Sequence, residues 1–207
     1  MGIGVFLTSN ANAIPQPDHV VIVIEENHSI YEIIGSTSAP YINSLATEGA
    51  LFTMSYGVSH PSQGNYLALF NGIEQVVNDT CPPPGSPYSD PNLASELLAV
   101  GLTFGGYSQS LDAVGSTTCT NADSEGHYAR KHNPWVDFFN VPDSVNMPFV
   151  GFFPTDYTML PTVSIVVPNL EHDMHNGTDP ARIVAEIIGL KVISMLTNSG
   201  RRRTIAS

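Results

Sequence analysis

Two short runs of β-branched residues stand out in the pattern of hydrophobic and polar positions. Residues 19–24 read HVVIVI and residues 162–167 read TVSIVV. Continuous apolar runs of this length are typical of strands buried on both faces of a parallel sheet. Each run ends in a polar stretch, EENHS after the first and PNLEHDMH after the second. Because ligands collect at the carboxyl ends of strands in open α/β sheets, we expect functional residues in both stretches.

Between these two runs, helical and strand-like segments alternate. Ile42, Leu45 and Ala46 have helical spacing, and Gly49 is suited to end that helix. The other predicted elements are a short strand over 50–54, helices over 62–71 and 92–100, and a strand over 103–107, with loops over 78–91 and 121–142. This alternation predicts an α/β fold with a mostly parallel central sheet flanked by helices.

The composition limits the partners of the chain. Its 207 residues suit one domain or part of a larger one. Acidic residues outnumber basic ones 19 to 7, whereas binding to nucleic acid or to a membrane surface needs a basic face. The three arginines over 201–203 are the only basic run, and no segment has the apolar length of a membrane span. We therefore expect no nucleic-acid partner and no stable membrane span.

The first thirteen residues have features of an export signal. A brief apolar run over 3–7 is followed by the tripeptide Ala-Asn-Ala over 11–13, which has the form of a signal-peptidase site. Residues 1–13 are either the remnant of a signal peptide, the hypothesis we favour, or a flexible N-terminus. Export predicts a secreted or periplasmic protein. It would also permit a disulfide between Cys81 and Cys119, for which two unrelated thiols are the alternative.

Glu26 and Asn27 follow the first predicted strand directly. A carboxylate beside an amide carbonyl makes an oxygen-rich site that suits a divalent metal ion. The alternative is a solvated strand end in which Asn27 forms a turn. Without further context, the solvated strand end is the commoner case.

Ser62 stands at the start of the predicted helix over 62–71, within the stretch SHPSQGNYLALFNG. A serine at this place commonly caps the helix, and capping alone would explain it. A nucleophile there would gain from free backbone N–H groups and the positive end of the helix dipole, which can hold a phosphoryl group. A serine hydroxyl needs a base or a metal ion to become nucleophilic. Asn65, about one turn further on, could donate to a phosphate oxygen.

The remaining candidates lie in two later segments. His172, Asp173 and His175 form an H-D-x-H set that could ligate a metal ion or contact a phosphate, or simply lie in an exposed loop. Lys131 and His132, within YARKHNPW, are candidates for phosphate contact, with a solvated loop as the alternative.

Five stretches occur in order along the chain: VVIVIEENHSIYEIIG, APYINSLATEGALFTMSYGVSHPSQGNYLALFNG, NLASELL, YARKHNPWVDFFNV and VPNLEHDMHNGTDP. Together they resemble the phosphoesterase family that includes bacterial acid phosphatases and phospholipases C, within the alkaline-phosphatase-like superfamily. They cover most of positions 19–183, and five ordered motifs are more specific than any one alone. The resemblance implies a metal-dependent ester hydrolase with a phosphate-ester substrate and a divalent metal ion as cofactor.

The resemblance also implies roles for individual residues. These are Glu26, Asn27 and Asp173 for metal binding, Ser62 and His175 for catalysis, and Asn65, His60, Lys131 and His132 for substrate binding. In the implied mechanism Ser62 attacks phosphorus, the alcohol leaves with a proton from His175, and water then cleaves the phosphoserine. We expect Ser62 to act both as helix cap and as nucleophile. Gly64 stands where the family often has Pro, which we expect to loosen the turn.

The C-terminal part departs from the family pattern. From residue 184 the chain reads VAEIIGLKVISMLTNSGRRRTIAS, without the GD-x-W-L helix, the acidic metal cluster and the later His that the resemblance implies. We expect residues 14–183 to be the N-terminal portion of a phosphoesterase domain and residues 184–207 to be an aberrant or disordered tail, produced by truncation or by a frame shift near Ala185. The chain is then either an exported phosphoesterase or a catalytically inactive fragment of one.

Overall fold

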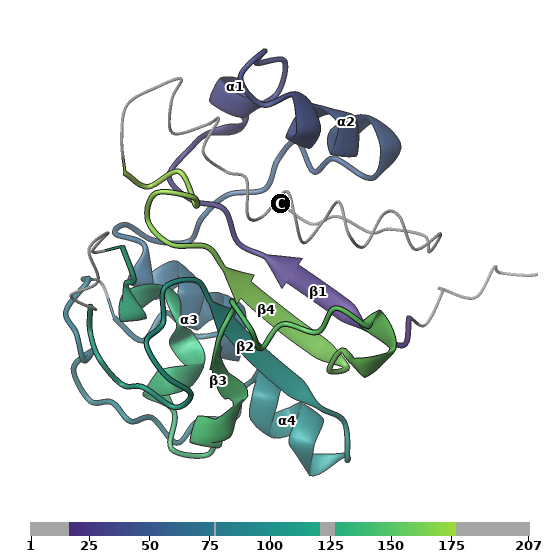
Figure 1. Ribbon diagram of the computed structural model, residues 1–207. Helices are drawn as coiled ribbons and strands as arrows, with labels where there is room; N and C mark the ends of the chain where they lie inside the picture. The colour runs from purple at the N-terminus through teal and green to yellow at the C-terminus, as the bar shows by residue number, and fades with distance from the viewer. Residues whose placement is uncertain (1–16, 77, 121–126, 177–207) are drawn as a thin grey trace, which may run out of the picture.

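The computed structural model describes residues 17–76, 78–120 and 127–176 (Figure 1). Its centre is a sheet of parallel strands in the order β1–β4–β2–β3. The strands are β1 (Val20–Val23), β2 (Phe104–Ser108), β3 (Asn146–Pro148) and β4 (Val163–Val167). The two hydrophobic runs form the neighbouring strands β1 and β4, and the predicted α/β fold is confirmed.

The helices lie in the connections between strands. They are α1 (Ile30–Ile33), α2 (Pro40–Glu48), α3 (Gln63–Asn71) and α4 (Leu93–Ala99), with the short 3-10 helices η1 (Arg130–His132), η2 (Pro134–Asp137), η3 (Asp143–Val145) and η4 (Tyr157–Met159). α3 ends at Gly72, whose φ of 79° is the left-handed conformation that commonly follows a helix. Gly49, after α2, has an extended backbone instead. Figure 1 shows α1 and α2 beyond the ends of β1 and β4, and α4 beside β2.

Hydrophobic side chains pack on both faces of the sheet. Ile165 and Val166 are neighbours in β4, so their side chains point to opposite faces. Ile165 belongs to the larger cluster, which includes residues of α3, α4 and η2, among them Trp135. Gly106 of β2 makes room for this indole, because a Cβ there would lie 2.3 Å from the ring. Val166 belongs to a smaller cluster that it forms with Tyr107.

The predicted strand over 50–54 is not formed. Phe52, Met54, Tyr56 and Val58 alternate with polar or small residues, as in a strand with one apolar face, yet all four side chains are exposed. A strand requires a neighbour for its backbone hydrogen bonds, and the segment pairs with no strand in the described part of the chain. The local pattern was therefore misleading.

Two predicted segments lie outside the described residues, namely the signal-peptide remnant over 1–13 and the tail over 184–207. The predicted domain over 14–183 is described only within the three ranges given above. In those ranges, no helix has the length and apolar character needed to span a bilayer.

Candidate active site

The chain that follows β1 meets the chain that follows β4. The backbone N–H of Glu26 donates to the backbone carbonyl of Asp173 at 2.7 Å. The side chain of Asp173 is fully buried and that of Glu26 nearly so. Because β1 and β4 are parallel neighbours, both polar stretches leave the same edge of the sheet and their carboxylates converge.

His132 lies between these carboxylates and Ser62. Its Nε2 is 2.9 Å from Glu26 Oε1 and 3.2 Å from Ser62 Oγ. Its Nδ1 is 3.4 Å from Asp173 Oδ2. One imidazole from η1 therefore joins the ends of β1 and β4 to the start of α3.

His175 completes the group on its solvent side. Its Nδ1 contacts Glu26 Oε2, and its backbone N–H donates to Asp173 Oδ1 at 2.7 Å. The His175 side chain is 28% exposed, compared with 1% for His132. A molecule arriving from solvent would meet His175 before His132. We call Glu26, Ser62, His132, Asp173 and His175 the Glu26 cluster.

The helix α3 holds the imidazole of His132 in place. The ring of Tyr66 stacks on it, with centroids 4.6 Å apart and planes inclined by 14°. Ser62 precedes α3 and Tyr66 lies one turn further along, so one helix contacts both an edge and a face of the imidazole. Burial, together with the charges of Glu26 and Asp173, raises the pKa of the Tyr66 hydroxyl well above its usual value, so the hydroxyl stays protonated.

The electrostatics of the cluster favour a charged Glu26. Burial raises the pKa of Glu26, but the close contacts and charges of His132 and His175 outweigh it and hold this pKa well below its usual value. Burial lowers the pKa of His132, whereas Asp173 and Glu26 raise it, and the net shift is upward. Within the described residues, the ion-pair partners of these two carboxylates are imidazoles and not permanent cations.

Two buried carboxylate oxygens in the cluster lack a hydrogen bond, namely Glu26 Oε1 and Asp173 Oδ2. Both lie near a ring nitrogen of His132, though without the angles of a hydrogen bond. Glu26, His132 and His175 each offer one ligand atom, and these three atoms all lie within 4.8 Å of one another. A carboxylate oxygen and two imidazole nitrogens at this spacing suit a borderline divalent cation. The donor set fits a metal ion and shares Glu26 with the predicted set.

Ser62 does not cap α3, which corrects the expected double role. It occupies the N-cap position with φ −63° and ψ −36°, and its side chain makes no capping hydrogen bond. The Asp79 carboxylate accepts the backbone N–H of Gln63, the first residue of α3, at 3.1 Å. The Ser62 hydroxyl contacts His132 and not the backbone of its own helix.

Gly64 is required for tight packing at the start of α3. A Cβ at this position would lie 2.7 Å from the backbone oxygen of Val76 and 3.0 Å from Ser59 Oγ. Such distances would force the backbone to move. The expectation that Gly64 loosens the turn is therefore wrong, because the glycine allows the chain to pack closely there.

The amide of Asn65 is engaged with the segment that leads to Ser62. Its Oδ1 accepts the backbone N–H groups of Val58 and Ser59 at 2.7 and 3.0 Å. Its Nδ2 donates to the carbonyl of Ser59 at 2.8 Å. The phosphate contact predicted for Asn65 stays a prediction, and the observed role of the amide is to fix this approach segment.

Three other predicted residues lie apart from the Glu26 cluster. Lys131 Nζ is 2.7 Å from Asp79 Oδ2. His60 is exposed, and Asn27 is exposed with a φ of 65°, a left-handed conformation that Asn tolerates well. Among the described residues, no contact joins the Asn27 or His60 side chain to the cluster. Their predicted roles in metal and substrate binding stay predictions.

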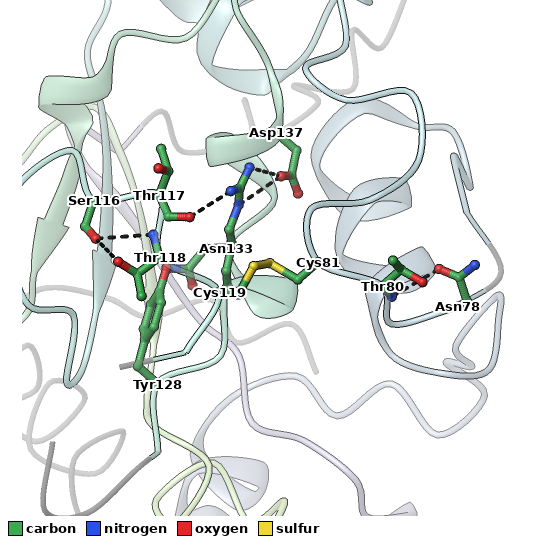
Figure 2. The surroundings of a disulfide bond; sticks show 11 residues. Asn78, Thr80, Cys81, Ser116, Thr117, Thr118, Cys119, Tyr128, Asn133 and Asp137 are labelled. Atoms are coloured by element: carbon green, nitrogen blue, oxygen red, sulfur yellow. Dashed lines mark hydrogen bonds and ion pairs between the residues drawn. A yellow bond between two sulfur atoms is a disulfide. The ribbon is translucent and has the colours of Figure 1, made fainter. Parts of the chain in front are cut away.

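Cys81 and Cys119 form a disulfide, with Cα atoms 5.8 Å apart, which decides between the two alternatives left by the sequence (Figure 2). The carbonyl of Cys119 accepts the backbone N–H of Arg130 at 3.0 Å. The disulfide thus ties the turn-rich loop after α3 to the start of η1.

Arg130 forms a buried ion pair that is separate from the Glu26 cluster. Its Nε and Nη2 donate to Asp137 Oδ1 at 3.2 and 2.7 Å, and its Nη1 donates to the carbonyl of Thr117 at 2.8 Å. Burial raises the pKa of Asp137 to about 6, and the charge of Arg130 opposes this shift only in part.

Sequence reasoning missed two residues that shape the site. The one-turn spacing from Ser62 to Tyr66 could have placed the tyrosine on the same helix face, but its apolar surroundings indicated a core residue. Nothing local marks Asp79, because its partners lie 16 and 52 residues away. Only the folded chain reveals that carboxylate.

Residues 36–201 match the Phosphoesterase family. The chain belongs to this family. The matched range contains Ser62, His132, Asp173 and His175 and begins after Glu26.

Curated relatives of this phosphoesterase carry the names of phosphatases. A phosphatidylinositol-3-phosphatase of Mycobacterium tuberculosis is 52% identical over 170 residues, which are 81% of this chain and 55% of that protein. A probable acid phosphatase of Kluyveromyces lactis is 26% identical over 166 residues, 76% of this chain and 38% of the relative. A phosphate-repressible acid phosphatase of Penicillium chrysogenum is 28% identical over 142 residues, 65% of this chain and 34% of the relative.

The phosphoesterase therefore spans about half of the mycobacterial relative and about a third of the fungal ones. No solved structure matches the chain.

Proposed function

We propose that this phosphoesterase hydrolyses phosphate monoesters with Ser62 as nucleophile and a divalent cation at Glu26. The observation that carries the proposal is that Ser62 Oγ and Glu26 Oε1 both lie at Nε2 of the same imidazole, His132. A nucleophile and a charged group on opposite sides of the molecule would have excluded such chemistry. The phosphatase names of the relatives support a phosphate ester as substrate.

The chemistry of the chain's own residues takes two displacements. The Ser62 hydroxyl gives up its proton to solvent, its Oγ attacks phosphorus, a phosphoserine forms, and the bond from phosphorus to the substrate alcohol breaks. His175, the partly exposed histidine of the cluster, gives a proton to the departing alcohol oxygen. It then takes a proton from the water that attacks the phosphoserine, the bond from phosphorus to Ser62 Oγ breaks, and Oγ regains a proton from solvent as inorganic phosphate leaves. The positive end of the α3 dipole favours the anionic phosphoryl group throughout.

The two orphaned carboxylate oxygens support a role for a cation. Glu26 and His132 would hold the ion, with the second carboxylate, Asp173, on the other side of His132, and His175 beside them would stay available for the proton transfers. A bound divalent cation would supply the positive charge that lowers the pKa of the serine hydroxyl and neutralises the phosphoryl oxygens.

A second candidate mechanism for the same hydrolysis needs no cation. His132 Nδ1 faces Asp173 while Nε2 faces Ser62, which is the order of groups in a serine–histidine–aspartate triad. In that case His132 Nε2 takes the proton of Ser62, and the buried Asp173 carboxylate orients the ring and stabilises its positive charge. The stacking of Tyr66 would hold the ring in either case.

We also propose an exported protein. The disulfide Cys81–Cys119 supports this, because disulfides persist in oxidising compartments. The net charge of −12 supports a substrate that is a small ester and not a nucleic acid.

The test is hydrolysis of p-nitrophenyl phosphate by the full chain and by Ser62→Ala. We expect the substitution to lower kcat by at least about 10³-fold, because it removes the attacking atom. Ser55→Ala, an exposed serine of the same approach segment, is the matched control and should leave kcat unchanged. Equal rates for Ser62→Ala and the wild type would refute the assignment of Ser62 as the nucleophile.

Removal of divalent cations by a chelator distinguishes the cation-dependent mechanism from the cation-independent one. Dialysis against EDTA should abolish turnover, and one added divalent metal should restore it, if a cation takes part. Retention of full turnover after dialysis would favour His132 acting as a base without a cation. A folded wild-type chain with no turnover under any metal would instead support the inactive-fragment hypothesis.

A further inference from the structure

We propose that Asp79 is a positioning residue that sets the distance between Ser62 and His132. This inference rests on the proposed function, because it assumes that the contact between those two side chains matters for turnover. Asp79 was not among the residues predicted from sequence. It lies in the turn-rich loop after α3 and is about one third exposed as a side chain.

One carboxylate oxygen of Asp79 is bound to the Ser62 side of the contact. Oδ1 accepts the N–H of Gln63, the residue directly after Ser62. This bond satisfies one of the backbone N–H groups that a helix start leaves without an intrahelical partner. A serine at the N-cap position would normally turn its own hydroxyl to another N–H of this first turn, that of the second or third helical residue. Ser62 makes no such bond, Asp79 anchors the first residue of the helix, and Ser62 Oγ is turned to His132 Nε2.

The other carboxylate oxygen of Asp79 is bound to the His132 side. Oδ2 lies 2.7 Å from Nζ of Lys131, the residue directly before His132. Lys131 is the middle residue of the three-residue helix η1, and its partly buried ammonium is bound to Asp79, next to His132 at the end of the helix. A shift of Lys131 would therefore move the imidazole with it.

Asp79 thus bridges the same two segments that meet in the Ser62–His132 contact. The start of α3 and η1 are therefore connected twice. Asp79 connects them through the neighbours of the two reacting residues, and the Ser62 hydroxyl connects them directly through His132. The disulfide restrains the loop that carries Asp79. Cys81 lies two residues after Asp79, and the carbonyl of its partner Cys119 accepts the backbone N–H of Arg130. The carboxylate is therefore held by its own loop as well as by its two partners.

The bridge also gives Lys131 a role. With its ammonium committed to Asp79, Lys131 positions η1 and does not need to touch the substrate. Loss of Lys131 should then lower kcat and leave KM nearly unchanged, whereas loss of a phosphate contact would raise KM.

The experiment compares Asp79→Ala, Asp79→Asn, Lys131→Met and the double variant Asp79→Asn/Lys131→Met in p-nitrophenyl phosphate hydrolysis. Asp79→Ala loses both links, and misplacement of the nucleophile by about 1 Å should lower kcat by about 100-fold. Asp79→Asn keeps an oxygen for Gln63 and should lose only about 10-fold. KM should stay within about threefold in all of them.

The double variant gives the sharpest result. If Asp79 acts on Lys131, then the double variant should be no slower than Asp79→Asn alone, because the second change removes a link that is already broken. Multiplying losses would overturn the bridge. Asp112→Asn, which removes an exposed aspartate elsewhere, is the control and should match the wild type.

An NMR measurement tests the same geometry without relying on turnover. In Asp79→Ala, the amide resonance of Gln63 and the ring resonances of His132 should both shift. In Asp79→Asn, the His132 resonances should shift while the Gln63 amide stays near its wild-type position. Unchanged His132 resonances in both variants would overturn the proposal.

The two proposals fail in different ways. Full activity of Ser62→Ala would refute the proposed function. The NMR measurement would still test whether Asp79 positions Ser62 and His132. Loss of activity in Ser62→Ala together with a wild-type kcat in Asp79→Ala would end only the inference about Asp79.

Discussion

Two buried acidic sites depend on residues that are almost adjacent in the chain. Arg130 and His132 are the first and last residues of η1, yet Arg130 pairs with Asp137 and His132 with Glu26. At the first site, a permanent cation donates twice to one carboxylate oxygen and once to the carbonyl of Thr117. At the second, the carboxylates meet only imidazoles in the contacts described above.

The two sites differ in how fully their buried carboxylate oxygens are hydrogen-bonded. A buried carboxylate paired with a bidentate guanidinium has its charge balanced by the protein itself. Glu26 Oε1 and Asp173 Oδ2 are buried without a hydrogen bond, so the second site has acceptor capacity to spare. A carboxylate that already meets a permanent cation needs no further ligand, whereas buried carboxylate oxygens without a hydrogen bond can bind an added cation. The Arg130–Asp137 pair is therefore the structural counterpart of the Glu26 cluster.

Breaking the structural pair should have the largest effect. Arg130→Met leaves the Asp137 carboxylate buried without its partner, and the free energy of unfolding should fall by about 3–5 kcal/mol in urea denaturation. Replacing both partners, as in Arg130→Met/Asp137→Leu, should recover most of the loss, because no buried charge remains. A double variant as unstable as the single one would contradict this account.

Breaking the cluster should instead affect turnover. Glu26→Gln keeps the shape of the side chain but removes the charge that faces His132 and His175, so kcat should fall by at least about 100-fold. Divalent-metal affinity, measured by calorimetry, should weaken in parallel. Glu171→Gln removes a more exposed carboxylate that pairs with His127 and serves as the matched control. If Glu26→Gln unfolded the protein as readily as Arg130→Met, the distinction between the two sites would be lost.

The pH dependence of stability should carry the signature of Asp137. Its pKa rises from the ordinary value of 3.8 to about 6, so the native state binds the proton more tightly than the unfolded state. The stability from this proton is fully present below pH 3.8 and is lost as the pH rises through 6. Relative to Asp137→Asn, the wild type should lose up to about 3 kcal/mol between pH 4 and 7.

The measurement is urea denaturation of both proteins across that range. The difference between them isolates Asp137, because Glu26 and the histidines titrate in both. A constant difference from pH 4 to 7 would mean that Arg130 keeps Asp137 ionised throughout.

The smallest effect is expected at Asn27. Asn27→Gly keeps the left-handed backbone, which glycine adopts freely, and removes an exposed amide. We expect the free energy of unfolding to change by no more than about 0.5 kcal/mol and divalent-metal affinity to stay the same. A clear loss of metal affinity would show that Asn27 turns into the cluster when an ion binds.

Much of the fold could be predicted from sequence because it depends on local patterns. The β-branched runs over 19–24 and 162–167 became β1 and β4, and α3 ended at Asn71, the last residue of the predicted helix. The segment over 50–54 has an equally good strand pattern but no neighbouring strand in the described ranges. A strand is completed by its partner, so its pattern alone could not decide the outcome.

The candidate site was predictable in its parts and not in its connections. The positions of Glu26 and Asp173 after hydrophobic runs marked them as candidates, and Ser62 stood out at a helix start. No local pattern indicated that Ser62 would not cap α3 or that Asp79 would bind the first residue of this helix. Contacts at a helix start usually come from within a few residues, and here the carboxylate comes from 16 residues away.

The sequence by itself determined that the β-branched runs over 19–24 and 162–167 form strands and that acidic side chains follow them, because backbone preference and apolar character of these runs are set by neighbouring residues. The tertiary structure alone decided which carboxylate each residue of Arg130-Lys131-His132 meets: Asp137, Asp79 and Glu26. These three consecutive side chains point in different directions, and loop closure brings their partners from 7 to more than 50 residues away. Charge pairing over such separations depends on the path of the whole chain, which no local pattern contains.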